Sequence, residues 1–199
     1  MTETIPEVKI TMLGKQGAGK TSLSYRFQSD RFDINTAPTI GAAFIAKTIE
    51  VGSDKMKIYL WDTAGTERFS SLAPMYIRSG YVVFICFDEV DLRDLAARVR
   101  VTEENNPLAK IFLVATKHDQ IKDLTPYEAV QTYATEKGFP LYFTSSATYY
   151  GIDQLFRDAA IEGNLVGQQI RKTAEKTIKI FDDEAPMPPA QKWWVWNPC

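Results

Sequence analysis

Short apolar runs alternate along the chain with stretches in which apolar residues recur at helical spacing. Strands are predicted at residues 8–13, 42–51, 55–61, 81–87, 111–115 and 141–143, and helices at 20–29, 93–104, 126–137 and 152–174. Such alternation is typical of an α/β fold in which helices cover both faces of a mainly parallel sheet. Only Gly52, Ser53 and Asp54 separate the second and third strands, which predicts a hairpin. We therefore expect a six-stranded, mostly parallel sheet with one antiparallel edge strand.

The composition changes after about residue 175. Three acidic residues at 182–184 are followed by prolines at 186, 188 and 189 and by tryptophans at 193, 194 and 196. Prolines and clustered acids neither continue a helix nor build a core. We predict one domain over residues 1–175 and an acidic tail containing proline and tryptophan over residues 176–199.

Charge and composition exclude several classes of function. The 199 residues carry a net charge of −2, which gives no basic footprint for nucleic acid. No apolar run has the length of a membrane span, so any membrane contact is expected to be peripheral. The acidic N-terminus is not a secretory signal, and two cysteines suit a reducing cytosol better than a disulfide framework. A single histidine, His118, argues against histidine metal clusters and Ser-His-Asp hydrolases.

Residues 14–21 match the phosphate-binding pattern G-x-x-x-x-G-K-[ST], directly after the first predicted strand and at the start of a helix. In this setting the backbone N–H groups surround phosphates, and the helix N-terminus adds a favourable field. Lys20 is expected to reach the β- and γ-phosphates, and the hydroxyl of Thr21 to bind magnesium. The residues assigned to nucleotide here are Gln16, Gly17, Ala18, Gly19, Lys20, Thr21 and Ser22.

Two further motifs follow predicted strands at their carboxyl ends. Asp62 ends the third strand, where a second magnesium anchor belongs, with water as the expected bridge. The backbone N–H of Gly65 is expected to approach the γ-phosphate. Asp119 follows the fifth strand in the run Thr116-Lys117-His118-Asp119, where its carboxylate can accept two hydrogen bonds that guanine offers and adenine does not.

This order of motifs is that of the Ras-superfamily GTPases, and the chain resembles them over residues 8–171. It is similar to Rab proteins at residues 39–44, 57–61 and 68–78, and most similar to their early-endosome branch at residues 41–44 and 71–76. The resemblance implies a P-loop GTPase domain that binds GTP or GDP with Mg²⁺ and acts as a molecular switch in vesicular, endosomal trafficking. It implies three classes of partner: effector proteins, an exchange factor and a GTPase-activating protein. It also implies a cytoplasmic protein that cycles to the cytosolic face of endosomal or other vesicle membranes.

The resemblance also assigns roles to single residues. It gives Thr39 to magnesium and to the γ-phosphate, and Phe32 to the face of the guanine. The base is expected to meet the backbone of Ser146, within a loop match that includes Ser145 and Ala147. Catalysis is assigned to Lys20, Thr39, Gly65 and Thr66, and effector binding to Phe44, Trp61 and Tyr76.

Four positions depart from the family pattern. Thr66 stands where the family has the glutamine that orients the attacking water, and Gln16 is larger than the usual P-loop residue. Both changes predict slow intrinsic hydrolysis with binding intact. Thr116 replaces the usual asparagine, as it does in Rho-type GTPases. A single Cys199 replaces the usual cysteine pair as the lipidation site, and one prenyl chain needs a second anchoring signal. The tail tryptophans suit either a membrane interface or packing on protein.

Two other hypotheses remain open. The protein could be a scaffold that stays loaded with GTP, binds effectors and hydrolyses little or nothing; Thr66 and Gln16 favour this. It could also be a small P-loop kinase, which would need an arginine-rich lid and would have no use for residues 116–119.

Overall fold

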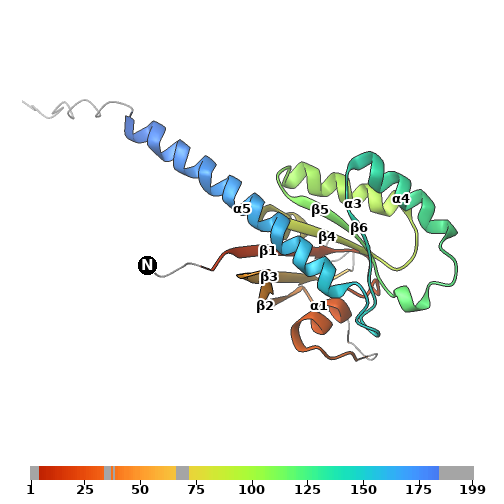
Figure 1. Ribbon diagram of the computed structural model, residues 1–199. Coiled ribbons are helices and arrows are strands. Elements are labelled where there is room, and N and C mark those ends of the chain that lie inside the picture. The colour runs from red at the N-terminus through yellow and green to blue at the C-terminus, as the bar shows by residue number, and fades with distance from the viewer. Residues whose placement is uncertain (1–4, 34–36, 38, 66–71, 184–199) are drawn as a thin grey trace, which may run out of the picture. The chain divides into compact units, whose positions relative to one another are not determined.

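The computed structural model describes residues 5–33, 37, 39–65 and 72–183, with side chains up to residue 176. Within these ranges six strands form one sheet in the order β2-β3-β1-β4-β5-β6 (Figure 1). β2 and β3 are antiparallel, and the other neighbours pair in parallel. The strands are β1 (Glu7–Leu13), β2 (Ala42–Val51), β3 (Asp54–Thr63), β4 (Val82–Phe87), β5 (Lys110–Ala115) and β6 (Leu141–Phe143). The predicted six-stranded sheet with an antiparallel edge strand is confirmed.

The helices follow the prediction with two additions and one extension. They are α1 (Lys20–Ser29), α2 (Ala73–Ser79), α3 (Leu92–Asn105), α4 (Thr125–Lys137) and α5 (Ile152–Asp183), with a 3-10 turn η2 (His118–Gln120). α2 and η2 were not expected from the sequence pattern. α5 was expected to end at residue 174, but it continues to the acidic residues because the intervening sequence contains no glycine or proline. No helix in the described ranges is both long and apolar enough to cross a bilayer.

The chain divides into two compact units, Met1–Gly167 and Gln168–Cys199. The first contains the whole sheet and helices α1 to α4. The second is helical as far as Asp183. The predicted division into a domain over residues 1–175 and a tail over residues 176–199 stays a prediction.

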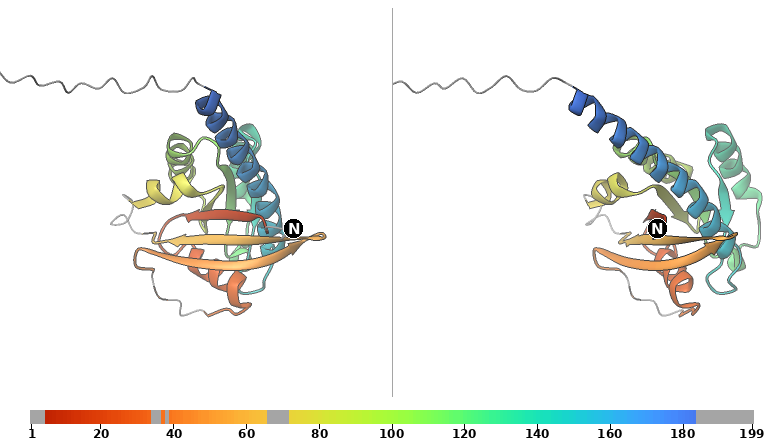
Figure 2. Two further views of the ribbon diagram at one scale, coloured as in Figure 1. Left: turned by 90° about the vertical axis from the view of Figure 1, so that its left-hand side faces the viewer. Right: turned by 60° about the vertical axis from the view of Figure 1, so that its left-hand side comes forward.

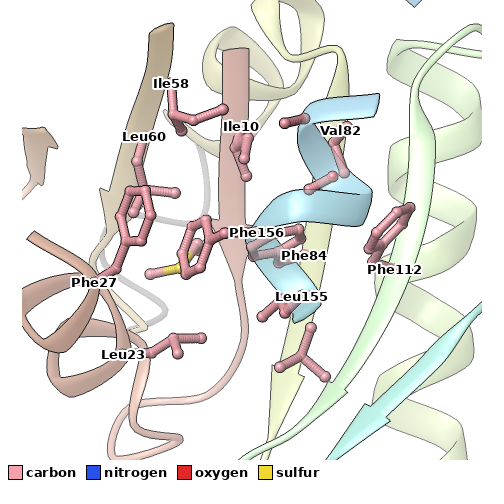
Figure 3. Close-up of a cluster of buried hydrophobic side chains, with 14 of the residues drawn as sticks. Ile10, Leu23, Phe27, Ile58, Leu60, Val82, Phe84, Phe112, Leu155 and Phe156 are labelled. Carbon is pink, nitrogen blue, oxygen red and sulfur yellow. The ribbon is translucent and has the colours of Figure 1, made fainter. Parts of the chain in front are cut away.

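Side chains on the two faces of the sheet form two hydrophobic cores in the first unit. α1 and the first turns of α5 cover one face, and α2, α3 and α4 cover the other (Figure 2). In the first core Phe156 of α5 stacks on Phe27 of α1, with ring centroids 3.7 Å apart, and meets Phe84 edge-on (Figure 3). β4 is buried along its whole length because its side chains alternate between the cores.

Helices leave the outer face of β2 uncovered in the described part of the chain. Phe44, Ala46, Thr48 and Glu50, at every second position, are exposed. The carboxyl ends of the parallel strands meet at a different place, the edge of the sheet where the predicted nucleotide motifs lie. In open α/β sheets this edge is where ligands bind.

Candidate functional site

The P-loop runs from the end of β1 to the start of α1 in close contact with β4. Gly14 has a φ of +152°, and a Cβ there would lie 2.2 Å from the carbonyl oxygen of Cys86. Any larger residue would therefore push the loop away from the sheet. α1 begins after Gly19 without a side-chain cap and without an acidic residue in its first turn. Its N-terminus can thus receive an anion.

The ammonium group of Lys20 is held inside the P-loop. Its Nζ donates to the carbonyl oxygens of Gly14 and Lys15, at 2.9 Å each. Only 5% of the residue is exposed, and this burial lowers the pKa of Lys20, while the Asp62 carboxylate acts in the opposite direction. A cation so oriented lies where the phosphates of a nucleotide would need it.

Next to Lys20, three oxygen-bearing side chains converge from three different segments. The hydroxyls of Thr21 and Thr39 are 2.7 Å apart. Asp62 is fully buried; its Oδ2 accepts a 3.4 Å hydrogen bond from Ser24, and its Oδ1 has no hydrogen-bond partner among the described residues. Burial raises the pKa of Asp62, against the hydrogen bonds from its hydroxyl neighbours. A buried carboxylate oxygen without a partner beside two hydroxyls fits a hard cation such as Mg²⁺.

Gly65 brings the end of β3 against the P-loop. A Cβ on Gly65 would lie 2.4 Å from the backbone nitrogen of Gln16 and 2.6 Å from the carbonyl oxygen of Lys15. The N–H of Ala64 donates to the carbonyl oxygen of Gly41 at 2.8 Å, which ties the segments on either side of the β2–β3 hairpin together. Thr66, one of the four predicted catalytic residues, lies outside the described residues.

At the opposite end of the cavity lie the two segments that are predicted to bind the base, residues 116–119 and 145–147. They contact each other, and the first also contacts the P-loop. The hydroxyl of Thr116 donates to the carbonyl oxygen of Ala18 at 3.0 Å, which links base and phosphate loops. A carboxylate oxygen of Asp119 accepts from the hydroxyl of Ser145. The ring of His118 stacks on Tyr150, with centroids 4.5 Å apart. This stack was not expected, since nothing in the sequence pairs residues so far apart.

One cavity of about 380 Å³ joins these parts, a size suited to a small-molecule ligand. Its lining brings together most of the predicted nucleotide residues. Ala18 and Ser145 are buried and are not part of the lining, and Asp62 lies fully buried beside Thr21. Ala37, Thr63 and Gln120 line it without having been predicted. The predicted residues in the lining are Gln16, Gly17, Gly19, Lys20, Thr21, Ser22, Phe32, Thr39, Gly65, Thr116, Lys117, Asp119, Ser146 and Ala147. Their contacts with nucleotide stay a prediction.

The three predicted effector residues form a row of aromatic rings. The centroid of Trp61 lies 4.7 Å from that of Phe44 and 5.3 Å from that of Tyr76. Phe44 is half exposed and the other two are partly buried. Tyr59 extends the row, with its ring centroid 5.6 Å from that of Phe44. It was not predicted, although its spacing of two residues from Trp61 places both on one face of β3.

Comparisons with known proteins agree with this geometry. The Ras family model matches residues 9–163. The rat Ras-related protein Rab-31 is 36% identical over 158 residues, which cover 77% of this chain and 81% of the relative. The rice Ras-related protein Rab5A is 34% identical over 174 residues, 85% of each chain. The mouse Ras-related protein Rab-22A is 34% identical over 155 residues, 75% of this chain and 80% of the relative.

Proposed function

Because this chain belongs to the Ras family of small GTPases, and within it to the Rab proteins of the early-endosome branch, we propose that its cavity binds GTP or GDP with Mg²⁺ and that bound GTP is hydrolysed slowly. The chain is thus a Rab-like GTPase of vesicle and endosomal trafficking. The single observation that supports the magnesium and nucleotide site is the buried Oδ1 of Asp62, which has no hydrogen-bond partner in the described chain and lies beside the hydroxyls of Thr21 and Thr39.

The phosphate end of the site is built from the residues around Lys20. Its ammonium group would hold the β- and γ-phosphates, while the N–H groups of the P-loop and of Gly65 surround them. Thr21, Thr39 and Asp62 would hold Mg²⁺, with Asp62 acting through water. When bound, the metal neutralises charge on the phosphates.

The base end would select guanine. Ser145 holds one oxygen of Asp119, and this contact orients the carboxylate that would accept from the guanine ring. A wrong base would cover this carboxylate without offering it donors, and a polar group left unpaired in this way can discriminate by roughly 10⁴–10⁵. Competition between GTP and ATP in the presence of Mg²⁺ tests this assignment, and equal affinities would contradict it.

Slow hydrolysis follows from position 66. A threonine is shorter than the usual glutamine and cannot both accept from the attacking water and donate to the phosphate. Gln16, in the cavity lining, adds bulk near the γ-phosphate. The same two residues favour the second candidate, a scaffold that remains loaded with GTP.

Single-turnover phosphate release from preloaded GTP separates these candidates. We expect Thr66→Gln to raise the intrinsic rate about tenfold, equivalent to roughly 1.4 kcal/mol of barrier. Thr48→Gln, on the exposed face of β2, is the matched control and should leave the rate unchanged. If the native protein already hydrolyses as fast as Thr66→Gln, slow turnover is refuted. If neither protein releases phosphate even with an activating protein, the scaffold is the better description.

Effectors are proposed to bind the aromatic row, because exposed aromatic clusters supply much of the energy of protein interfaces. The exchange factor and the activating protein are proposed to act at the nucleotide cavity. Membrane contact is proposed to be peripheral, with Cys199 as a lipidation site. Cys199 and the tryptophans lie outside the described residues.

A further inference from the structure

Lys15, the second residue of the P-loop, forms an ion pair outside the nucleotide cavity. Its Nζ lies 2.7 Å from Oδ2 of Asp91, which precedes α3. The other oxygen of Asp91 accepts from the backbone N–H groups of Arg93 and Asp94, at 3.1 Å each, and so caps the helix. The carboxylate is therefore fixed by α3, and the ion pair restrains Lys15.

The backbone of Lys15 contributes directly to the phosphate site. Its carbonyl oxygen accepts from Nζ of Lys20 at 2.9 Å and from the N–H of Ala18 at 3.3 Å. Gly65 also approaches the same carbonyl. A shift of Lys15 would therefore move one of the two oxygens that orient the phosphate-binding ammonium group.

The charges around Lys15 leave Asp91 as its partner. Asp94, the next carboxylate on α3, is already held by two hydrogen bonds from Arg98, at 2.8 and 3.0 Å. The hydrogen bond from Lys15 lowers the pKa of Asp91, and the same bond raises the pKa of Lys15. Both side chains are about half exposed, so the attraction should weaken in salt.

We propose that Asp91 is a positioning residue for the nucleotide, because its ion pair with Lys15 fixes the P-loop carbonyl that orients Lys20 and so slows nucleotide dissociation. The inference rests on the proposed nucleotide site. It assigns to the start of α3 a role in setting how long nucleotide stays bound.

The test measures dissociation of fluorescent GDP from the full chain in excess Mg²⁺, at low and at high salt. Lys15→Met removes the charge and keeps most of the unbranched side chain. Asp91→Ser removes the charge and keeps a good helix cap. At low salt each variant should raise the dissociation rate about two- to fivefold, as expected for a partly exposed ion pair. The double variant should add little to either one, and high salt should remove the differences.

Two controls separate positioning from general destabilisation. Lys15→Arg should restore the native rate. Breaking the pair of Arg100 and Glu104, 3.0 Å apart on the exposed side of α3, should leave the rate unchanged. Native rates in Lys15→Met and Asp91→Ser, or fully additive effects in the double variant, would overturn the proposal. If the native protein binds no guanine nucleotide, the proposed function is refuted, and the positioning role of Asp91 is refuted with it.

Discussion

Replacement of Asp62 by asparagine should have opposite effects on stability with and without the metal. The carboxylate of Asp62 is fully buried, one of its oxygens has no partner in the described chain, and burial raises its pKa. The protein without ligand therefore contains a charge that its surroundings disfavour. An asparagine of the same shape removes that charge, and its amide can donate to the neighbouring hydroxyls of Thr21 and Thr39.

The size of the effect follows from the buried oxygen. An unsatisfied buried acceptor costs about 1–3 kcal/mol, and more when it is charged. Removing this charge should therefore stabilise the protein without ligand. Part of that stabilisation is offset because the variant also loses the attraction between Asp62 and Lys20. We expect Asp62→Asn without nucleotide or metal to be more stable by about 1 kcal/mol, which raises the melting temperature by roughly 2–4 °C for a chain of this size.

With saturating GDP and Mg²⁺ the order should reverse. A ligand present at 100 times its dissociation constant stabilises the folded protein by about 2.7 kcal/mol, and each tenfold loss of affinity removes about 1.4 kcal/mol of this. Asp62→Asn lacks the anionic ligand for the metal, so its gain from Mg²⁺ should be small.

The assay is thermal unfolding of both proteins with EDTA and with GDP and Mg²⁺. Asp158→Asn is the matched control, since that carboxylate accepts from Tyr142 at 2.6 Å and from Gln154, away from the nucleotide. It should lower stability in both buffers and leave the response to Mg²⁺ unchanged. A lower melting temperature of Asp62→Asn in EDTA, or a native response to Mg²⁺, would refute the assignment of Asp62.

Three further outcomes follow from other residues. Asp119→Asn should weaken GTP strongly and favour xanthosine triphosphate in competition binding; unchanged preference would contradict the role of Asp119. Gly65→Ala should lower affinity for a GTP analogue more than for GDP, because its Cβ would meet the P-loop backbone where the γ-phosphate is expected; equal losses would argue against that contact. Burial, then the hydrogen bond to Asp153, raises the pKa of Tyr149 to about 12 from an ordinary value of 10. Its neutral form thus contributes stability below pH 10 that is lost as the pH rises to about 12. Tyr149→Phe should flatten this fall in a denaturant titration, and an identical slope would refute it.

The sequence predicted the sheet and the phosphate loop because both leave strong local patterns. Strand β4 is buried on both sides and is therefore a continuous apolar run. The P-loop is recognisable because only glycine satisfies the approach to Cys86 at Gly14. Helix α2 escaped prediction because it has seven residues, of which only Ile77 is buried. So short a helix shows no periodic pattern.

The contacts in and around the site that the sequence did not predict join distant residues. Lys15 and Asp91 are separated by 76 positions, and neither residue by itself differs from an ordinary surface charge. The stack of His118 on Tyr150 likewise requires the loops after β5 and β6 to lie together. Tyr59 is different, because the alternation along β3 already placed it beside Trp61. Attention to that alternation could have found it.

Two neighbouring residues of β3 face different surroundings and should therefore be under different selective constraints. Trp61 is part of the outward aromatic row, while the next residue, Asp62, is fully buried beside the hydroxyls of Thr21 and Thr39. Phe44 and Tyr59 lie on the outward face as well, and none of these rings is among the described residues that line the cavity. After gene duplication, substitutions around this proposed effector face would change what a copy binds without altering the residues that line the nucleotide cavity.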